Sequence, residues 1–146
     1  MWRRFEAICL CLVALAGAAG CGSSRSKEVS PDASFERHFR RGIAEVRVTH
    51  DRTKLRRELI RILATIRGDT PSTEAARRAR RVGIQGFEAT LKGVESLLDF
   101  SENDSGNLTA ATRDARRADR YLTLGADRLR AAGRMLGISV GTLNQH

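Results

Sequence analysis

The sequence contains only two prolines, one tryptophan and one tyrosine among 146 residues. So little proline argues against a proline-rich stalk or a disordered tail, and the remaining composition is typical of one globular domain. The glycine-rich, serine and histidine motifs of common nucleotide-binding, hydrolase and zinc-protease sites are missing. We therefore expect a protein that is not an enzyme and that binds no metal and no cofactor.

Acidic residues are fewer than basic ones. The chain has 26 Lys and Arg against 17 Asp and Glu, a net charge of +9, and only three of its cations are lysines. A basic balance favours anionic partners such as lipid headgroups, envelope polymers or nucleic acid, without choosing among them.

The clearest motif lies at the N-terminus. Arg3 and Arg4 precede an uncharged run over residues 7–20. This run is shorter than the roughly 20 apolar residues that span a bilayer, and it fits the core of a signal peptide. It ends in Ala18-Ala19-Gly20-Cys21. These four residues resemble the lipobox of bacterial lipoproteins, a resemblance that covers about the first 22 residues.

The resemblance implies that residues 1–20 are removed and that Cys21 is acylated and anchors the chain to a membrane. The charge then falls to +8, because Arg3, Arg4 and Glu6 are lost. Two alternatives remain open: secretion after cleavage at an Ala-x-Ala site, and an uncleaved segment that serves as a weak anchor. Cys9 and Cys11 lie within the removed segment, so acylation also accounts for the single cysteine that is left.

The rest of the chain is predicted to be helical. Residues 21–30 comprise the lipidated cysteine and a small, polar, flexible tether. Residues 31–138 form the folded domain, and residues 139–146 a loose C-terminal tail. Apolar residues recur at helical spacing in three stretches, and strand patterns are nearly absent. Short loops between long helices favour antiparallel neighbours, so the predicted fold is an all-α antiparallel three-helix bundle.

The three stretches have recognisable ends. The first begins at Ser30-Pro31 and ends at Gly68, with a kink, a local unwinding or a change of packing partner expected over residues 49–53. The second begins at Thr70-Pro71 and ends near residues 100–102. The third runs from Leu108 to Leu136, stops at Gly137, and carries alanine and glycine along its seam. Glycines of the second stretch, Gly83, Gly86 and Gly93, indicate close helix packing.

Few side chains suggest chemistry. His38 and His50 are twelve residues apart, which is too far for chelation from one helix face, and His146 is the last residue. Tyr121 is predicted to be a half-buried ring with an exposed hydroxyl. Acidic and basic residues at i, i+3 and i+4 predict intrahelical ion pairs, among them Glu36–Arg40, Glu74–Arg78 and pairs of Asp114, Asp119 and Asp127 with Arg117, Arg120 and Arg130.

Arginine clusters are the feature with most functional promise. The densest consists of Arg77, Arg78, Arg80 and Arg81, which is either a solvated face or a patch for anionic lipid or envelope polymer. Other clusters lie at residues 40–41, 56–57 and 113–120. Nucleic acid is not expected as a partner, because an anchored, exported protein rarely meets it and the chain offers no aromatic stacking platform.

These observations favour a lipid-anchored, non-enzymatic protein of the bacterial cell envelope whose helical domain binds another protein. Four apolar positions outside the main stripes are candidates for the partner surface: Ile60, Leu63, Ile84 and Leu124. The alternative is a binder of anionic lipid or polymer through the arginine clusters, and an enzyme or haem carrier is a remote third possibility.

Overall fold

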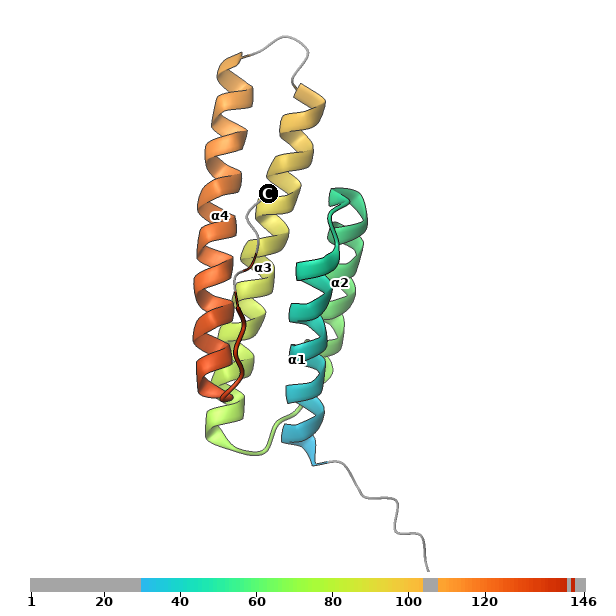
Figure 1. Cartoon of the computed structure of the whole chain (residues 1–146), viewed down its shortest axis with the longest axis vertical. Coiled ribbons are helices and arrows are strands. Elements are labelled where there is room, and N and C mark those ends of the chain that lie inside the picture. Colours follow the sequence, from blue (N-terminus) through green and yellow to red (C-terminus); the bar gives the residue numbers. More distant parts are fainter. Residues whose placement is uncertain (1–29, 104–107, 142, 144–146) are drawn as a thin grey trace, which may run out of the picture.

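The computed structural model describes residues 30–103, 108–141 and 143, and this part of the chain contains four α-helices and no strand. They are α1 (Pro31–Val48), α2 (Arg52–Gly68), α3 (Glu74–Asn103) and α4 (Leu108–Met135). The chain runs up α1, down α2, up α3 and down α4, so that two helical hairpins stand side by side (Figure 1). The all-α prediction is confirmed, whereas the three-helix bundle is wrong.

The error lies in the first helical stretch, which is a hairpin and not one long helix. Thr49 is the C-cap of α1, and the carboxylate of Asp51 accepts a hydrogen bond from the backbone N–H of Lys54 as the N-cap of α2. The polar residues 49–51 let the chain reverse completely, so the two out-of-phase apolar stripes face each other across the hairpin. Local unwinding was expected here, but a full reversal was not.

The start of α3 lies three residues beyond its predicted position at Pro71. The carboxylate of Asp32, in the first turn of α1, accepts hydrogen bonds from the N–H groups of Ser72 and Thr73 at 2.6 and 3.3 Å. The Thr73 hydroxyl accepts one from the Ala76 N–H. These bonds hold residues 72–73 outside the helix and tie the beginnings of α1 and α3 together. They also lower the pKa of Asp32, mainly through the Thr73 side chain and against the raising effect of desolvation.

The end of α4 follows the prediction closely. Gly137 has a φ of +66°, and the N–H of Ile138 donates to the Gly133 carbonyl at 2.8 Å. This pattern is typical of a helix that ends at a left-handed glycine and packs the next residue back. The predicted end at Gly68 is also confirmed: Gly68 is the last residue of α2, and Asp69 is the C-cap.

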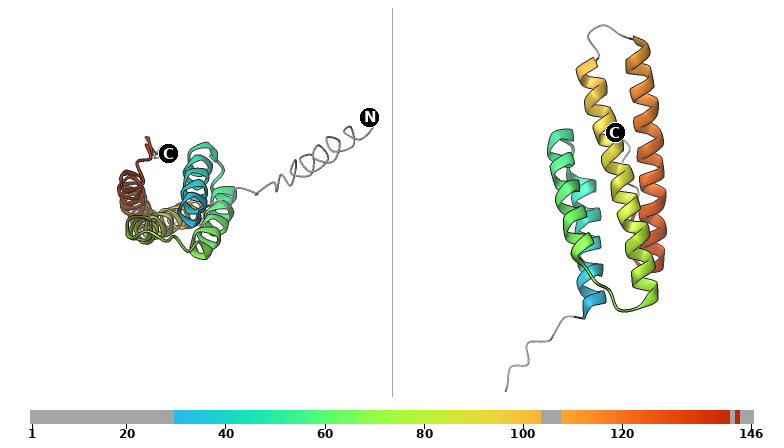
Figure 2. Two further views of the ribbon diagram at one scale, coloured as in Figure 1. Left: turned by 90° about the horizontal axis from the view of Figure 1, so that it is seen from below. Right: turned by 180° about the vertical axis from the view of Figure 1, so that it is seen from behind.

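The segment after α4 corrects the prediction of a loose tail from residue 139. Ile138, Val140 and Leu143 are buried and belong to the hydrophobic core. They enter the core between α4 and the α1–α2 hairpin, on the side where no helix of the described chain bridges α1 and α4 (Figures 1 and 2). Burial of these apolar side chains gives the segment a fixed place. Residues 142 and 144–146 lie outside the described part.

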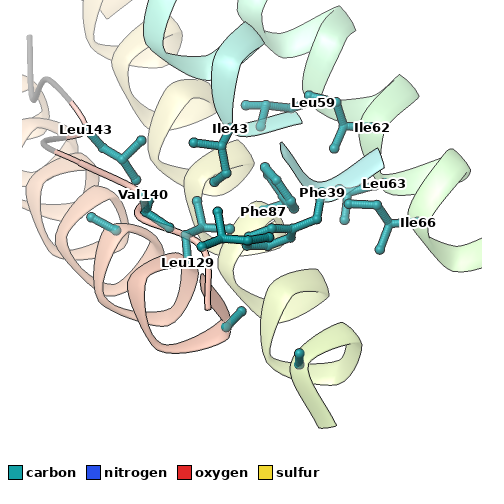
Figure 3. Close-up of a cluster of buried hydrophobic side chains, with 14 of the residues drawn as sticks. Phe39, Ile43, Leu59, Ile62, Leu63, Ile66, Phe87, Leu129, Val140 and Leu143 are labelled. Carbon is teal, nitrogen blue, oxygen red and sulfur yellow. The ribbon is translucent and has the colours of Figure 1, made fainter. Parts of the chain in front are cut away.

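Aromatic rings form the centre of the core. Phe39 of α1 meets Phe87 of α3 edge to face, with 5.8 Å between ring centroids, and Phe35 lies next to Phe39. Leucine and isoleucine side chains of α2 surround the rings on one side, and Leu129 with the C-terminal segment surrounds them on the other (Figure 3). The core therefore draws on all four helices.

Glycines allow α3 and α4 to pack closely, as predicted. A Cβ atom at Gly86 would lie 2.8 Å from Leu129 Cγ, and one at Gly93 would lie 2.7 Å from Leu122 Cγ. On α4, a Cβ at Gly125 would lie 2.9 Å from the backbone nitrogen of Thr90. The α3–α4 hairpin is thus tightly joined along this seam, and it extends beyond the turn of the shorter α1–α2 hairpin (Figures 1 and 2).

Candidate functional site

The predicted patch of Arg77, Arg78, Arg80 and Arg81 lies in the first turns of α3, but one of its members has a structural role. Arg80 Nε donates to the Ile66 carbonyl at 2.9 Å, and its Nη2 donates to the Arg67 carbonyl at 2.5 Å. These carbonyls end α2, where a cation is favourable because the helix dipole is negative. Arg80 is half-buried and closes the α2–α3 corner.

Two more members of the patch share one carboxylate. Glu74 lies 3.4 Å from the guanidinium groups of both Arg77 and Arg81. The predicted pair of Glu74 with Arg78 is therefore wrong, and Arg78 has no ion pair with any described residue. The densest cluster in the sequence thus presents much less unpaired charge than its composition suggests.

A second row of arginines is far more open. Arg113, Arg116, Arg117 and Arg120 are exposed and, at i, i+3, i+4 and i+7, lie on one side of α4, away from the buried Ala111 and Ala118 of the α3 seam; we call this row the α4 arginine face. Arg117 lies 3.8 Å from the carboxylate of Asp114, and the exposed Asp119 precedes Arg120 on the same helix.

Apolar groups flank the α4 arginine face. The four arginines line one surface hollow together with Leu108, Tyr121 and Leu124, and no described carboxylate lines it. Leu108 and Leu124 are 87% and 39% exposed, which leaves apolar surface at both ends of the row. Tyr121 is half-buried, as predicted, and Lys92 Nζ lies 5.8 Å from the centre of its ring.

The four predicted partner-surface residues do not form one patch. Leu63 is buried in the core, and Ile84 is half-buried against it. Ile60 of α2 and Leu124 of α4 are exposed, as expected. Ile60 lines a separate shallow groove between α2 and α3, so only Leu124 joins the α4 arginine face.

The two described histidines lie in different places. His38 Nδ1 is 2.9 Å from the Asp69 carboxylate, an interaction that joins α1 to the end of α2. His50 lies between α1 and α2 and lines a pocket that has no acidic side chain among its described residues and does not include Tyr121. Among the described residues, no three His, Cys, Asp or Glu side chains are grouped to hold a metal ion, and no helix is long and apolar enough to cross a membrane.

Intrahelical ion pairs follow the sequence in part. Glu36–Arg40 is formed at 2.7 Å and Asp127–Arg130 at 2.9 Å, as predicted. Pairs between helices, which local spacing cannot reveal, are Arg56–Glu95 at 3.2 Å and Arg67–Glu88 at 2.7 Å.

Several predictions concern residues outside the described part. These are the signal peptide over residues 1–20, the lipidation of Cys21, the tether over residues 22–29 and the role of His146. Comparison of the whole chain with known proteins finds no match: no family model, no curated protein and no solved structure is similar to it.

Proposed function

We propose that the protein is a lipid-anchored, non-enzymatic interaction module of the bacterial cell envelope, and that the α4 arginine face binds an acidic segment of a partner protein. The observation that carries the proposal is the row of Arg113, Arg116, Arg117 and Arg120, which lines one surface hollow that has no described carboxylate in its wall and apolar groups at its ends. Arginine and tyrosine are enriched among residues that dominate binding energy at protein interfaces.

The chemistry of this face suits a helical partner segment. Four guanidinium groups spaced over two turns match carboxylates placed at the same spacing on a facing helix, each pair forming a bidentate contact. Leu108, Tyr121 and Leu124 supply the apolar contact that an anionic polymer would not need. We therefore favour a protein partner over envelope polymer.

The position of the face also favours a partner over the anchoring membrane. α1 begins at the end of the domain where α4 finishes, and the α4 arginine face lies towards the opposite end (Figure 1). At 1.5 Å per residue, Arg120 lies roughly 20 Å along α4 from Met135, and Arg113 roughly 30 Å. A chain anchored before residue 30 would hold this face away from its own bilayer.

Site-specific photocrosslinking in growing cells tests the proposal. A photoreactive amino acid at position 116 is expected to form an adduct with a protein, and the crosslinked peptide is expected to be rich in Asp and Glu. The same amino acid at position 57, an exposed arginine of α2 without an ion pair in the described chain, serves as the matched control.

Charge reversal makes the experiment specific. The double variant R113E/R120E should reduce the adduct about tenfold, and changing the acidic residues of the crosslinked peptide to arginine should restore it. Equal adducts at positions 116 and 57 would contradict the proposal. If adducts form with anionic lipid alone, the α4 arginine face has the alternative function, which is binding of anionic lipid.

A further inference from the structure

A second feature, unrelated to the α4 arginine face, is an apolar pocket beside the α1–α2 turn. It has a volume of about 340 Å³ and lies between the end of α1, the start of α2, and the middle of α3 and α4. Its wall is mainly aliphatic: Val46, Leu55, Val94, Leu97, Leu122 and Leu143.

The fold explains why the pocket exists. Among the described helices, the backbone of α4 packs closely against α3 alone, and the C-terminal segment fills part of the space between α1 and α4. Leu143 is part of the core and also lines the pocket, so the pocket lies next to the region that the C-terminal segment fills. Small side chains on its α4 side, such as the buried Ala126, leave the volume open.

The mouth of the pocket is basic. Arg47 from the last turn of α1, His50 from the turn and Arg52 from the first turn of α2 all line it, and no described Asp or Glu does. Asp51 is nearby, but its carboxylate caps α2 by accepting from the Lys54 N–H. Arg52 lies in the first turn of α2, which contains no acidic residue.

We infer that this pocket binds a single-chain amphiphile with an anionic head, such as a fatty acid or a lysophospholipid. The volume lies near the lower end of the roughly 300–1,000 Å³ typical of ligand pockets, which suits one hydrocarbon chain better than two. Aliphatic walls favour the chain, with about a fourfold gain in affinity for each buried methylene group. Arg47 and Arg52 favour a carboxylate or phosphate at the mouth.

Photolabelling of the full chain in isolated membranes tests the inference. The probe is palmitate with a photoreactive diazirine in its chain, and the reference is the matching alcohol, which has the same chain and no charge. Labelled peptides are expected to come from the end of α1, the start of α2 and the middle of α3 and α4, with palmitate labelling roughly tenfold above the alcohol. A diazirine lysophosphatidylglycerol then distinguishes a lysophospholipid from a fatty acid as the preferred source.

Two variants separate the pocket from general membrane contact. R47Q/R52Q changes two exposed side chains and should reduce palmitate labelling to nearly that of the alcohol, a loss of about tenfold. R37Q/R57Q removes one exposed arginine from each of the same two helices, away from the pocket, and should leave labelling unchanged. A126L fills the pocket and should abolish labelling, with circular dichroism to check its fold.

Two results would overturn the inference: equal labelling by palmitate and the alcohol, or labelling spread along the exposed faces. Neither of them bears on the α4 arginine face, because the pocket and that face share no residue.

Discussion

Asp32 shows how one half-buried side chain can connect distant parts of the fold. It lies in α1 and accepts hydrogen bonds from the N–H groups that precede α3, forty residues later. The Thr73 side chain, together with these bonds and the Ser72 hydroxyl, favours the ionised carboxylate and lowers its pKa below the usual 3.8, against the raising effect of desolvation. Because the folded pKa is lowered, the contribution of Asp32 to stability is present above the unfolded pKa and is lost as the pH falls through the folded value.

We predict that Asp32→Asn unfolds at a lower urea concentration than the native chain at neutral pH, because a neutral amide is a weaker acceptor than a carboxylate. The difference in urea midpoint should shrink below about pH 4 and vanish once the native carboxyl group is protonated. Urea titrations from pH 3 to pH 7 measure it, and a difference that stays constant over this range would contradict the role of the charge.

Contacts of individual arginines also explain why the sequence pattern pointed to the less exposed of two arginine clusters. Arginines are most closely spaced over residues 77–81, and this spacing favoured that cluster. In the fold, however, Arg80 donates to a carbonyl of α2, and Arg77 and Arg81 share the carboxylate of Glu74. Such contacts depend on tertiary placement, which local spacing does not reveal. The i, i+3, i+4, i+7 spacing of Arg113 to Arg120 was a usable signal for a single exposed face, since the stripe of Ala111, Ala118 and Leu129 defines the opposite side of α4.

At the scale of elements, helix type and most helix ends could be predicted from the sequence. Ser30 with Pro31, and Gly137 with Ile138, act as the caps that their residue types indicate. The reversal at residues 49–51 was not predicted, because a polar interruption in an apolar pattern fits a kink as well as a turn. The burial of Val140 and Leu143 was not predicted. Ile138, Val140 and Leu143 are separated by polar or small residues, so their spacing shows no clear period.

Close packing of α3 and α4 leads to a prediction about two glycines, one with close neighbours and one with open space around it. Gly125→Ala should destabilise the protein by about 1–3 kcal/mol, because the added methyl group meets the backbone of Thr90 and Gly86. Gly68→Ala should instead be neutral or stabilise it by about 0.5 kcal/mol, since nothing lies within 4 Å and its φ is not positive. Urea unfolding of both variants checks this, and equal effects would argue against a tight seam.

For the whole molecule, every member of the described core lies at or after Phe35. The lipoprotein hypothesis places cleavage after residue 20 and acylation at Cys21, both before this core in the chain. We predict that membrane-extracted protein has a mass lacking residues 1–20 and increased by acyl chains, and that Cys21→Ala loses both changes.

Intact-mass spectrometry of the two proteins decides between the possible N-termini. An unacylated, soluble chain cut after an Ala-x-Ala sequence would contradict the lipoprotein hypothesis and indicate a secreted protein. A chain that retains residues 1–20 would indicate an uncleaved anchor.

The C-terminal segment has a consequence for the order of events during synthesis. Ile138, Val140 and Leu143 belong to the core, and they follow all four helices in the chain. A growing chain can pair α1 with α2 and α3 with α4 early, but these three side chains can fill their places in the core only after α4 has been made. The finished core is therefore expected only once Leu143 has left the ribosome, whereas the two helical hairpins can form before then.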